Sequence, residues 1–305
     1  MSLISPADFE RETGQSNDLL RKWRERYGFP RLHREHGEVG YTREQVRQMR
    51  LILQLQKSGF RPSRIVGKSW DELESLRDLI APEPHLAQAL PVVEEAVGLL
   101  ERNQMKQFEE LVSRESITRT VPDFVTNIAA ALTVATGRAW EAGSVSIYQE
   151  HLFSNFLGSL LNRIALDKKP RDGYPKILFA TLSGEHHALG LLMAHAILAD
   201  QGAECIYFGS NVPSGELVSA ANALRPDILA LSFSLAYPQG RVLPDIKYLR
   251  SRLPESIEIW AGGSRVSSIR RKYEGVRLFT DLESSIEALH GFRAMMDGSA
   301  IRQSP

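Results

Sequence analysis

The sequence predicts three consecutive domains: an α-helical winged helix-turn-helix, a helical bundle, and a Rossmann-like α/β domain with a parallel sheet. Three observations predict this order. Capped helices flank a basic, glycine-punctuated stretch near the amino terminus, apolar residues at spacings of three and four follow, and apolar runs of strand length come last. We expect the domains to occupy residues 1–80, 84–168 and 174–295.

The length and charge distribution agree with several domains. A chain of 305 residues is long enough for each domain to bury its own core. Its net charge is zero, but residues 1–68 hold 14 Lys and Arg against 8 Asp and Glu, a net +6 that leaves −6 for residues 69–305. A basic unit ahead of an acidic remainder is typical of a nucleic-acid-binding module joined to a sensing module.

Cysteine content and hydropathy indicate the compartment. The single cysteine, Cys205, lies in a strand-like run, so we expect no internal disulfide and a buried, inert thiol. Residues 1–6 contain no basic stretch leading into an apolar segment, and no apolar run approaches membrane-spanning length. We therefore expect a cytoplasmic protein with no membrane partner.

The elements of the first domain follow from capping residues. Residues 6–13 predict a short helix ending at Gly14, and Ser16 is a good N-cap for a second helix that ends at Tyr27. The basic stretch 31–40 predicts the wing. Thr42 then caps a longer helix over 43–57, and Pro62 begins another turn.

The second helix offers a basic face. Its four cations cannot all point to a core, whereas Leu20 and Trp23 supply an apolar side, and we expect Trp23 to be buried. Segment 20–28 and Gly40-Tyr41 resemble the MerR-type DNA-binding domain, which implies operator DNA as a partner. The alternative is a solvated basic helix. The predicted DNA-binding residues are Arg21, Lys22, Arg24, Arg26, Arg31, Arg34, His36, Tyr41 and Arg43.

The middle of the chain predicts helices throughout. Residues 70–79 can form a helix, and the proline-containing segment 81–84 predicts a linker. Apolar spacing and punctuation near Gly137 then predict a four-helix bundle. Its helices are expected at 86–101, 104–113, 119–136 and 141–165, and a loop at 167–173 leads into the last domain.

A histidine follows the first strand of the α/β domain. Residues 176–182 predict a strand and residues 188–200 a helix, so Glu185 and His187 lie on the connecting loop. In an open α/β sheet this loop is at the carboxyl edge of the strands, where ligands bind. A neutral imidazole there can coordinate a transition metal, and a carboxylate two residues earlier can orient its other nitrogen. Gly190 would let the backbone approach a large planar ligand.

Small residues end two later strands at regular spacing. Ser232 and Ser234 follow the run 228–231, with 41 residues (191–231) between Gly190 and Ser232, and 27 residues (235–261) separate Ser234 from Gly262-Gly263. This spacing resembles the base-off cobalamin-binding module, Asp-x-His-x-x-Gly, Ser-x-Leu and Gly-Gly. The resemblance implies cobalamin as cofactor, bound through cobalt to His187. Two residues depart from it: Glu185 replaces Asp and Ser234 replaces Leu.

The same residues can also have purely structural roles. A lone loop histidine is usually solvated or satisfied, and Gly-Gly after a strand is usually a turn. A dinucleotide site is disfavoured, because the first strand-helix turn lacks Gly-x-Gly-x-x-Gly.

A further group of residues lies in the helical middle. Trp140 is followed after nine residues by Glu150-His151, which resembles the cap of the CarH/LitR family of light-responsive MerR-type regulators. The resemblance implies that Trp140 covers the upper face of adenosylcobalamin and that Glu150 and His151 stabilise its adenosyl group. Glu141 stands where that family has a histidine that takes the upper cobalt site after photolysis. The alternative for Trp140 is a core aromatic.

Together the resemblances imply a non-enzymatic transcriptional repressor that senses light through adenosylcobalamin. Its homo-oligomer, a dimer or tetramer, would bind operator DNA in the dark and release it after the cobalt–carbon bond breaks. One alternative is a cobalamin-dependent enzyme subunit. The lack of a substrate-barrel region in the sequence argues against it. The other is a regulator that keeps the fold but senses a protein partner or another chromophore.

Overall fold

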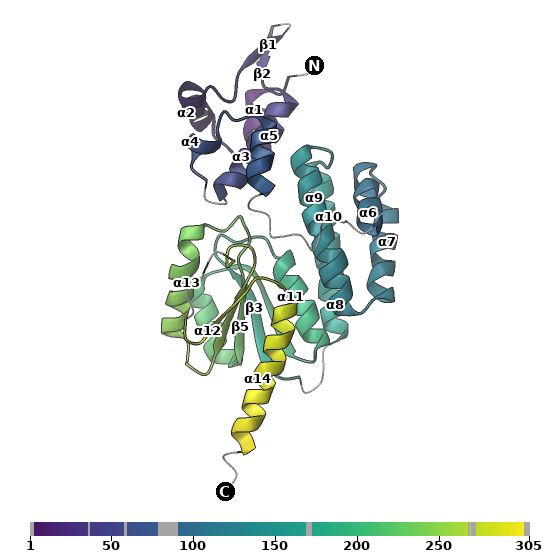
Figure 1. Cartoon of the computed structure of the whole chain (residues 1–305), viewed down its shortest axis with the longest axis vertical. Coiled ribbons are helices and arrows are strands. Elements are labelled where there is room, and N and C mark those ends of the chain that lie inside the picture. The colour runs from purple at the N-terminus through teal and green to yellow at the C-terminus, as the bar shows by residue number, and fades with distance from the viewer. Residues whose placement is uncertain are drawn as a thin grey trace. The chain divides into compact units, whose positions relative to one another are not determined.

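A computed structural model describes residues 3–35, 37–57, 60–78, 91–168, 173–267, 269 and 273–301 (Figure 1). The chain divides into two compact units. The first comprises Met1–Pro84 with Ala139–Ser144, and the second comprises His85–Arg138 with Val145–Pro305. None of the helices in the described part of the chain combines the length and apolar character needed to cross a bilayer.

The first unit has the helix boundaries that its capping residues predict. The Ser5 side chain caps α1 and the Ser16 side chain caps α2, and both helices end at a glycine in the left-handed conformation. A two-stranded antiparallel hairpin lies between α2 and α3 and forms the wing. The elements are α1 (Pro6–Thr13), α2 (Asn17–Tyr27), β1 (His33–Glu35), β2 (Glu38–Gly40), α3 (Arg43–Lys57), α4 (Pro62–Ile65) and α5 (Trp70–Asp78).

One apolar core holds this unit together. It joins Phe9 of α1, Leu20 and Trp23 of α2 and Met49 of α3, which are all buried. The ring of Tyr41, which follows the hairpin, lies 4.2 Å from that of Phe9. The prediction that Trp23 belongs to the core is therefore confirmed, and the wing is anchored to the helices through an aromatic pair.

The helical middle differs from its prediction at several helix ends: α7 ends at Thr118, α9 ends at Ala142, and α10 begins at Ile147. The third helix continues through Gly137 and Trp140, and the chain turns at Gly143, whose φ is +76°. Glycine inside a helix costs only about 1 kcal/mol, so punctuation at Gly137 was a wrong signal. The elements are α6 (Pro91–Glu101), α7 (Met105–Thr118), α8 (Val121–Asp123), the π-turn η1 (Phe124–Ala129), α9 (Ala130–Ala142) and α10 (Ile147–Asp167). The predicted linker 81–84 lies outside the described residues.

The α/β domain contains a five-stranded parallel sheet in the order β4-β3-β5-β6-β7. The strand order reverses between β3 and β5, and such a switch point is where open α/β sheets bind ligands at the carboxyl ends of their strands. The strands are β3 (Lys176–Leu182), β4 (Glu204–Val212), β5 (Ile228–Ser232), β6 (Glu258–Gly262) and β7 (Val276–Phe279). The helices are α11 (Leu189–Asp200), α12 (Ser214–Leu224), α13 (Gln239–Arg252) and α14 (Glu283–Ile301).

Helices cover both faces of this sheet (Figure 1). Alternate residues of β3 separate the two layers: Leu178 packs with α12 and α13, whereas Phe179 packs with α11 and α14. Burial on both faces explains why the central strands are continuously apolar. On α10, Gly158 has no side chain, and a Cβ there would lie 3.4 Å from Leu192 of α11, so the two helices approach closely.

Candidate functional site

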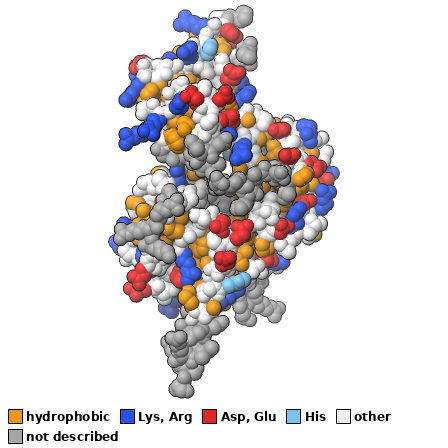
Figure 2. Space-filling model, viewed as in Figure 1, with side chains coloured by type: hydrophobic (Ala, Val, Ile, Leu, Met, Phe, Trp, Pro, Cys, Tyr) orange, Lys and Arg blue, Asp and Glu red, His pale blue; other side chains and the backbone are white. Residues whose placement is uncertain are grey.

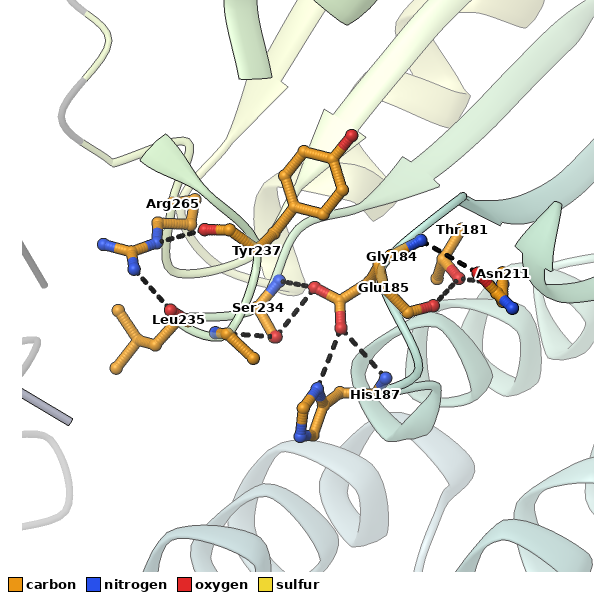
Figure 3. Close-up of polar contacts among 10 residues, drawn as sticks. Thr181, Gly184, Glu185, His187, Asn211, Ser234, Leu235, Tyr237 and Arg265 are labelled. Atoms are coloured by element: carbon orange, nitrogen blue, oxygen red, sulfur yellow. Dashed lines mark hydrogen bonds and ion pairs between the residues drawn. The ribbon is translucent and has the colours of Figure 1, made fainter. Parts of the chain in front are cut away.

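The loop between β3 and α11 is held by backbone and side-chain contacts from two neighbouring strands. The carbonyl of Glu185 accepts hydrogen bonds from the Thr181 hydroxyl at 2.6 Å and the Asn211 backbone N–H at 3.1 Å. The Asn211 side chain in turn accepts from the N–H of Gly184 at 2.8 Å. Asn211 has a φ of +59°, a region that asparagine tolerates better than most residues. The loop therefore has a defined shape at the switch point (Figure 3).

The Glu185 carboxylate is the centre of the site. It is fully buried, with 0% exposure, and each of its oxygens accepts two hydrogen bonds. Oε1 accepts from the backbone and from Nδ1 of His187, both at 2.9 Å, and Oε2 accepts from the backbone and hydroxyl of Ser234 at 2.8 and 2.7 Å. Burial alone would raise the pKa of Glu185, but these hydrogen bonds lower it below its ordinary value. The carboxylate is therefore ionised at neutral pH.

An ionised carboxylate determines which nitrogen of His187 carries the proton. Because a carboxylate only accepts hydrogen bonds, Nδ1 of the neutral ring must donate, and the lone pair is on Nε2. The His187 side chain is 63% exposed. The structure thus brings together the predicted ligand and its predicted partner, and most of the His187 side chain is accessible to solvent.

The two serines differ in role. Ser234 stands where the cobalamin module has Leu, and here its hydroxyl and backbone both serve Glu185. Ser232 ends β5 and is buried, and a Cβ on Gly190 would lie 3.4 Å from its hydroxyl oxygen. Glycine at position 190 therefore leaves room beside the end of β5.

Gly262 and Gly263 join the end of β6 to the loop 233–237 that carries Ser234, the serine loop. The Gly262 carbonyl accepts from the N–H of Phe233 at 2.9 Å. Gly263 has a φ of +100°, and a Cβ there would come within 2.5 Å of the Phe233 carbonyl oxygen. The close approach of two backbones therefore requires glycine at position 263, independently of any ligand.

The predicted cap residues fall on two helices. Trp140 is near the end of α9, where the Arg50 guanidinium lies 4.8 Å from its ring centre, and both residues cluster with the first unit. Glu150 and His151 begin α10. The Glu150 carboxylate lies 3.0 Å from Nδ1 of His151 and accepts from the Ser154 hydroxyl at 2.5 Å. Contacts of Trp140, Glu150 and His151 with a cofactor stay predictions.

Exposed cations are scattered among acidic and apolar side chains on the face of the first unit that Figure 2 shows. Arg21 and Lys22 of α2 both pair with Asp18 at 2.8 Å, and Arg43 of α3 pairs with Glu12 at 3.2 Å. These side chains remain largely exposed. The other predicted DNA contacts that are exposed are Arg26 of α2 and Arg31 and Arg34 of the wing region.

Other predicted DNA contacts have internal partners or are not described. Arg24 donates to the Tyr41 hydroxyl at 2.8 Å and to the Pro30 carbonyl at 3.1 Å, and Tyr41 is buried. The guanidinium of Arg26 lies 5.5 Å from the centre of the Tyr27 ring that follows it. His36 lies outside the described residues. All these DNA contacts stay predictions, and Arg24 and Tyr41 also link α2 to the wing.

Sequence reasoning missed Thr181, Asn211 and Arg265, which shape the loops around Glu185. One signal for Asn211 was present, because asparagine near the end of a strand tolerates positive φ better than most residues. Arg265 carries no signal in sequence, because its partners come from a different loop.

Comparison with known proteins agrees with this architecture. Residues 4–67 match the MerR HTH family regulatory protein family, and residues 175–289 match the B12 binding domain. The HTH-type transcriptional repressor CarH of Myxococcus xanthus is 25% identical over 258 residues, covering 82% of this chain and 85% of the repressor. The repressor CarA of the same organism is 27% identical over 227 residues, covering 73% and 74%.

A solved structure shares the fold. The monomethylamine corrinoid protein of Methanosarcina barkeri superposes with a TM-score of 0.50 at 15% identity, covering 65% of this chain and 96% of that protein. The family matches confirm the predicted order of a helix-turn-helix domain, a helical region and a Rossmann-like domain, and the curated relatives are repressors rather than enzymes. The chain therefore joins a MerR-type helix-turn-helix domain to a B12-binding domain, an organisation that supports a cobalamin-binding transcriptional regulator.

Proposed function

We propose that this regulator is an adenosylcobalamin-dependent, light-responsive repressor whose His187 binds cobalt through Nε2. In darkness a homo-oligomer, a dimer or tetramer, would hold operator DNA in the cytoplasm, and illumination would release it. The observation that carries the proposal is the hydrogen bond between the Glu185 carboxylate and Nδ1 of His187. This bond leaves the other ring nitrogen to a metal.

The residues of the site fit such a cofactor. A macrocycle brings its own equatorial ligands, so one imidazole is enough to hold its metal, as the proximal histidine does for haem iron. The exposed side chain of His187 lets a large flat ligand reach Nε2. Gly190, without a side chain, leaves space beside Ser232 at the end of β5.

When bound, adenosylcobalamin supplies a cobalt–carbon bond that visible light breaks. The chain's own residues orient the site: Glu185 keeps the proton on Nδ1 of His187, and Ser234 holds Glu185 in place. We keep Trp140, Glu150 and His151 as the proposed contacts to the adenosyl group. The proposed contacts to DNA phosphates are the exposed cations of α2, the wing and α3.

Absorption spectroscopy in the dark tests the cofactor. The purified full chain is mixed with adenosylcobalamin, and His187→Ala is compared with His186→Ala, an exposed neighbour in the same loop. We expect His187→Ala to bind weakly or without a histidine-bound spectrum, whereas His186→Ala behaves as the wild type. Equal spectra and affinities for all three proteins would exclude His187 as the ligand.

Binding to duplexes selected from a random-sequence pool tests the response. With adenosylcobalamin in the dark we expect a specific complex, and illumination should dissociate it. Light scattering of the same samples reports whether the dark form is a dimer or tetramer. A complex that forms equally in dark and light would leave a regulator that senses a protein partner or another chromophore.

A further inference from the structure

The loop 233–237, which follows β5, contacts Glu185 through Ser234. The Ser234 hydroxyl accepts from the N–H of Ala236 at 3.1 Å, which directs the hydroxyl proton toward Glu185 Oε2. The Ser234 N–H donates to the same oxygen. Both contacts therefore depend on how residues 233–237 turn beyond the end of β5.

Arg265 fixes that turn from the neighbouring loop. It follows Gly262-Gly263 and is buried, with 4% exposure. Its Nε donates to the Tyr237 carbonyl at 2.8 Å, and its Nη2 donates to the Leu235 carbonyl (Figure 3). Its own backbone N–H donates to the Phe233 carbonyl at 3.2 Å. One residue thus contacts three carbonyls of the loop that presents Ser234.

We propose that Arg265 is a positioning residue for His187. By binding the carbonyls of Leu235 and Tyr237, it holds Ser234 where its backbone N–H and hydroxyl donate to Oε2 of Glu185. Oε1 of Glu185 then accepts the hydrogen bond from Nδ1 of His187, so that the Nε2 lone pair is available to a metal. The part of this inference that concerns metal binding rests on the proposed function, but the control of the ring proton does not.

The chemistry of arginine suits this role. A guanidinium has donors in a fixed planar fork and can reach two carbonyls at once, which the single ammonium of lysine cannot reproduce in the same geometry. Its charge also interacts with the buried carboxylate: burial lowers the pKa of Arg265, and the negative charge of Glu185 opposes that effect. Without Arg265, the loop loses the two side-chain donors that bond the carbonyls of Leu235 and Tyr237.

The tautomer of His187 is the direct readout. Protein with 15N-labelled histidine is compared with Arg265→Met at mildly alkaline pH without cofactor, and a His187→Gln spectrum assigns the signal. The wild type should carry its proton mainly on Nδ1. In Arg265→Met we expect the ratio of Nδ1–H to Nε2–H forms to fall about tenfold, the factor expected when one charge-assisted hydrogen bond is lost.

Arg250→Met is the matched control. Arg250 also donates to backbone carbonyls, those of Leu253 and Ile257 at 3.0 and 2.5 Å, but these precede β6 and lie at the opposite edge of the sheet. This variant should lose stability while the tautomer ratio of His187 stays at the wild-type value. An equal fall in both variants would mean that the ratio reports general loosening, which would overturn the proposal.

Arg265→Lys decides the matter if Arg265→Met does not fold. Lysine lacks the planar fork that reaches both carbonyls in this geometry, so a fall of the same sign but smaller size supports the positioning role, and an unchanged ratio overturns it. Cobalamin spectra of the same variants separate the two proposals. A wild type that does not bind cobalamin through His187 refutes the proposed function, while the tautomer ratios still decide the role of Arg265.

Discussion

Acid should destabilise the α/β domain through one buried histidine. His195 of α11 is 3% exposed, lies between the rings of Phe179 and Tyr207, and its Nδ1 has no hydrogen-bond partner among the described residues. Burial lowers the pKa of His195 from 6.5 to about 4. The folded chain therefore binds fewer protons than the unfolded chain between these values, so its stability is complete above pH 6.5 and falls as the pH drops toward 4.

The size of this loss follows from the gap between the two pKa values. A gap of about 2.5 units at 1.36 kcal/mol per unit gives a loss of about 3 kcal/mol. His195→Phe keeps an aromatic ring between the same neighbours and cannot be protonated. We expect this variant to avoid most of the loss and to match or exceed the wild type near neutral pH, because it also removes the unpaired nitrogen.

Urea unfolding measures this difference at about pH 7 and about pH 4.5, a range in which the His195 contribution should change most. The fluorescence of Trp260 in β6 reports unfolding of the α/β domain when the other three tryptophans are replaced by Phe, namely Trp23, Trp70 and Trp140. Other groups titrate equally in both proteins and cancel in the comparison. If acid destabilised His195→Phe as much as the wild type, His195 would not be the buried neutral group described here.

Three further predictions concern a turn, the DNA interface and the upper cobalt site. Gly263→Ala should lower the free energy of unfolding by about 1–3 kcal/mol or more in urea, because residue 263 has a φ of +100° and a Cβ there would clash with Phe233. Gly262→Ala should cost less, since a Cβ at residue 262 would make only ordinary contacts at 3.8 Å. Arg21→Met should reduce the slope of log affinity against log salt by about 1 in a DNA titration, and an unchanged slope would remove its phosphate contact. Glu141→His should acquire a two-histidine absorption spectrum after illumination that the wild type lacks, since a carboxylate binds cobalt through oxygen; the same spectrum in the wild type would contradict this.

Local rules predicted the elements that local interactions determine. The caps at Ser16 and Thr42 and the glycine stop at Gly14 place helices where the structure has them, because side-chain caps and left-handed glycines act within one turn. The break expected at Gly137 was wrong, since packing of the surrounding apolar residues outweighs the weak helix propensity of one glycine. The edge strand β7 has only four half-buried residues and produces too short a run to recognise.

In the candidate site too, contacts between residues close in sequence could be predicted and long-range contacts could not. Glu185 and His187 lie two residues apart on one loop, so their contact could be expected from the sequence. The contact of Ser234 with Glu185 spans 49 residues, and that of Arg265 with Leu235 spans 30. These contacts arise because parallel strands bring their following loops to one edge, and the choice of partner there depends on backbone shapes that no local pattern records.

The close packing of α10 on α11 has a mechanical consequence. Helix α11 begins two residues after His187 and meets Gly158 of α10 through Leu192 and Leu189. Closely packed helices resist deformation. A small displacement of His187 toward a bound ligand would therefore shift α11 as a rigid body, and α11 would in turn displace α10. Helix α10 carries Glu150 and His151 in its first turns, on the amino-terminal side of Gly158, so a displacement of α10 would also move these two residues.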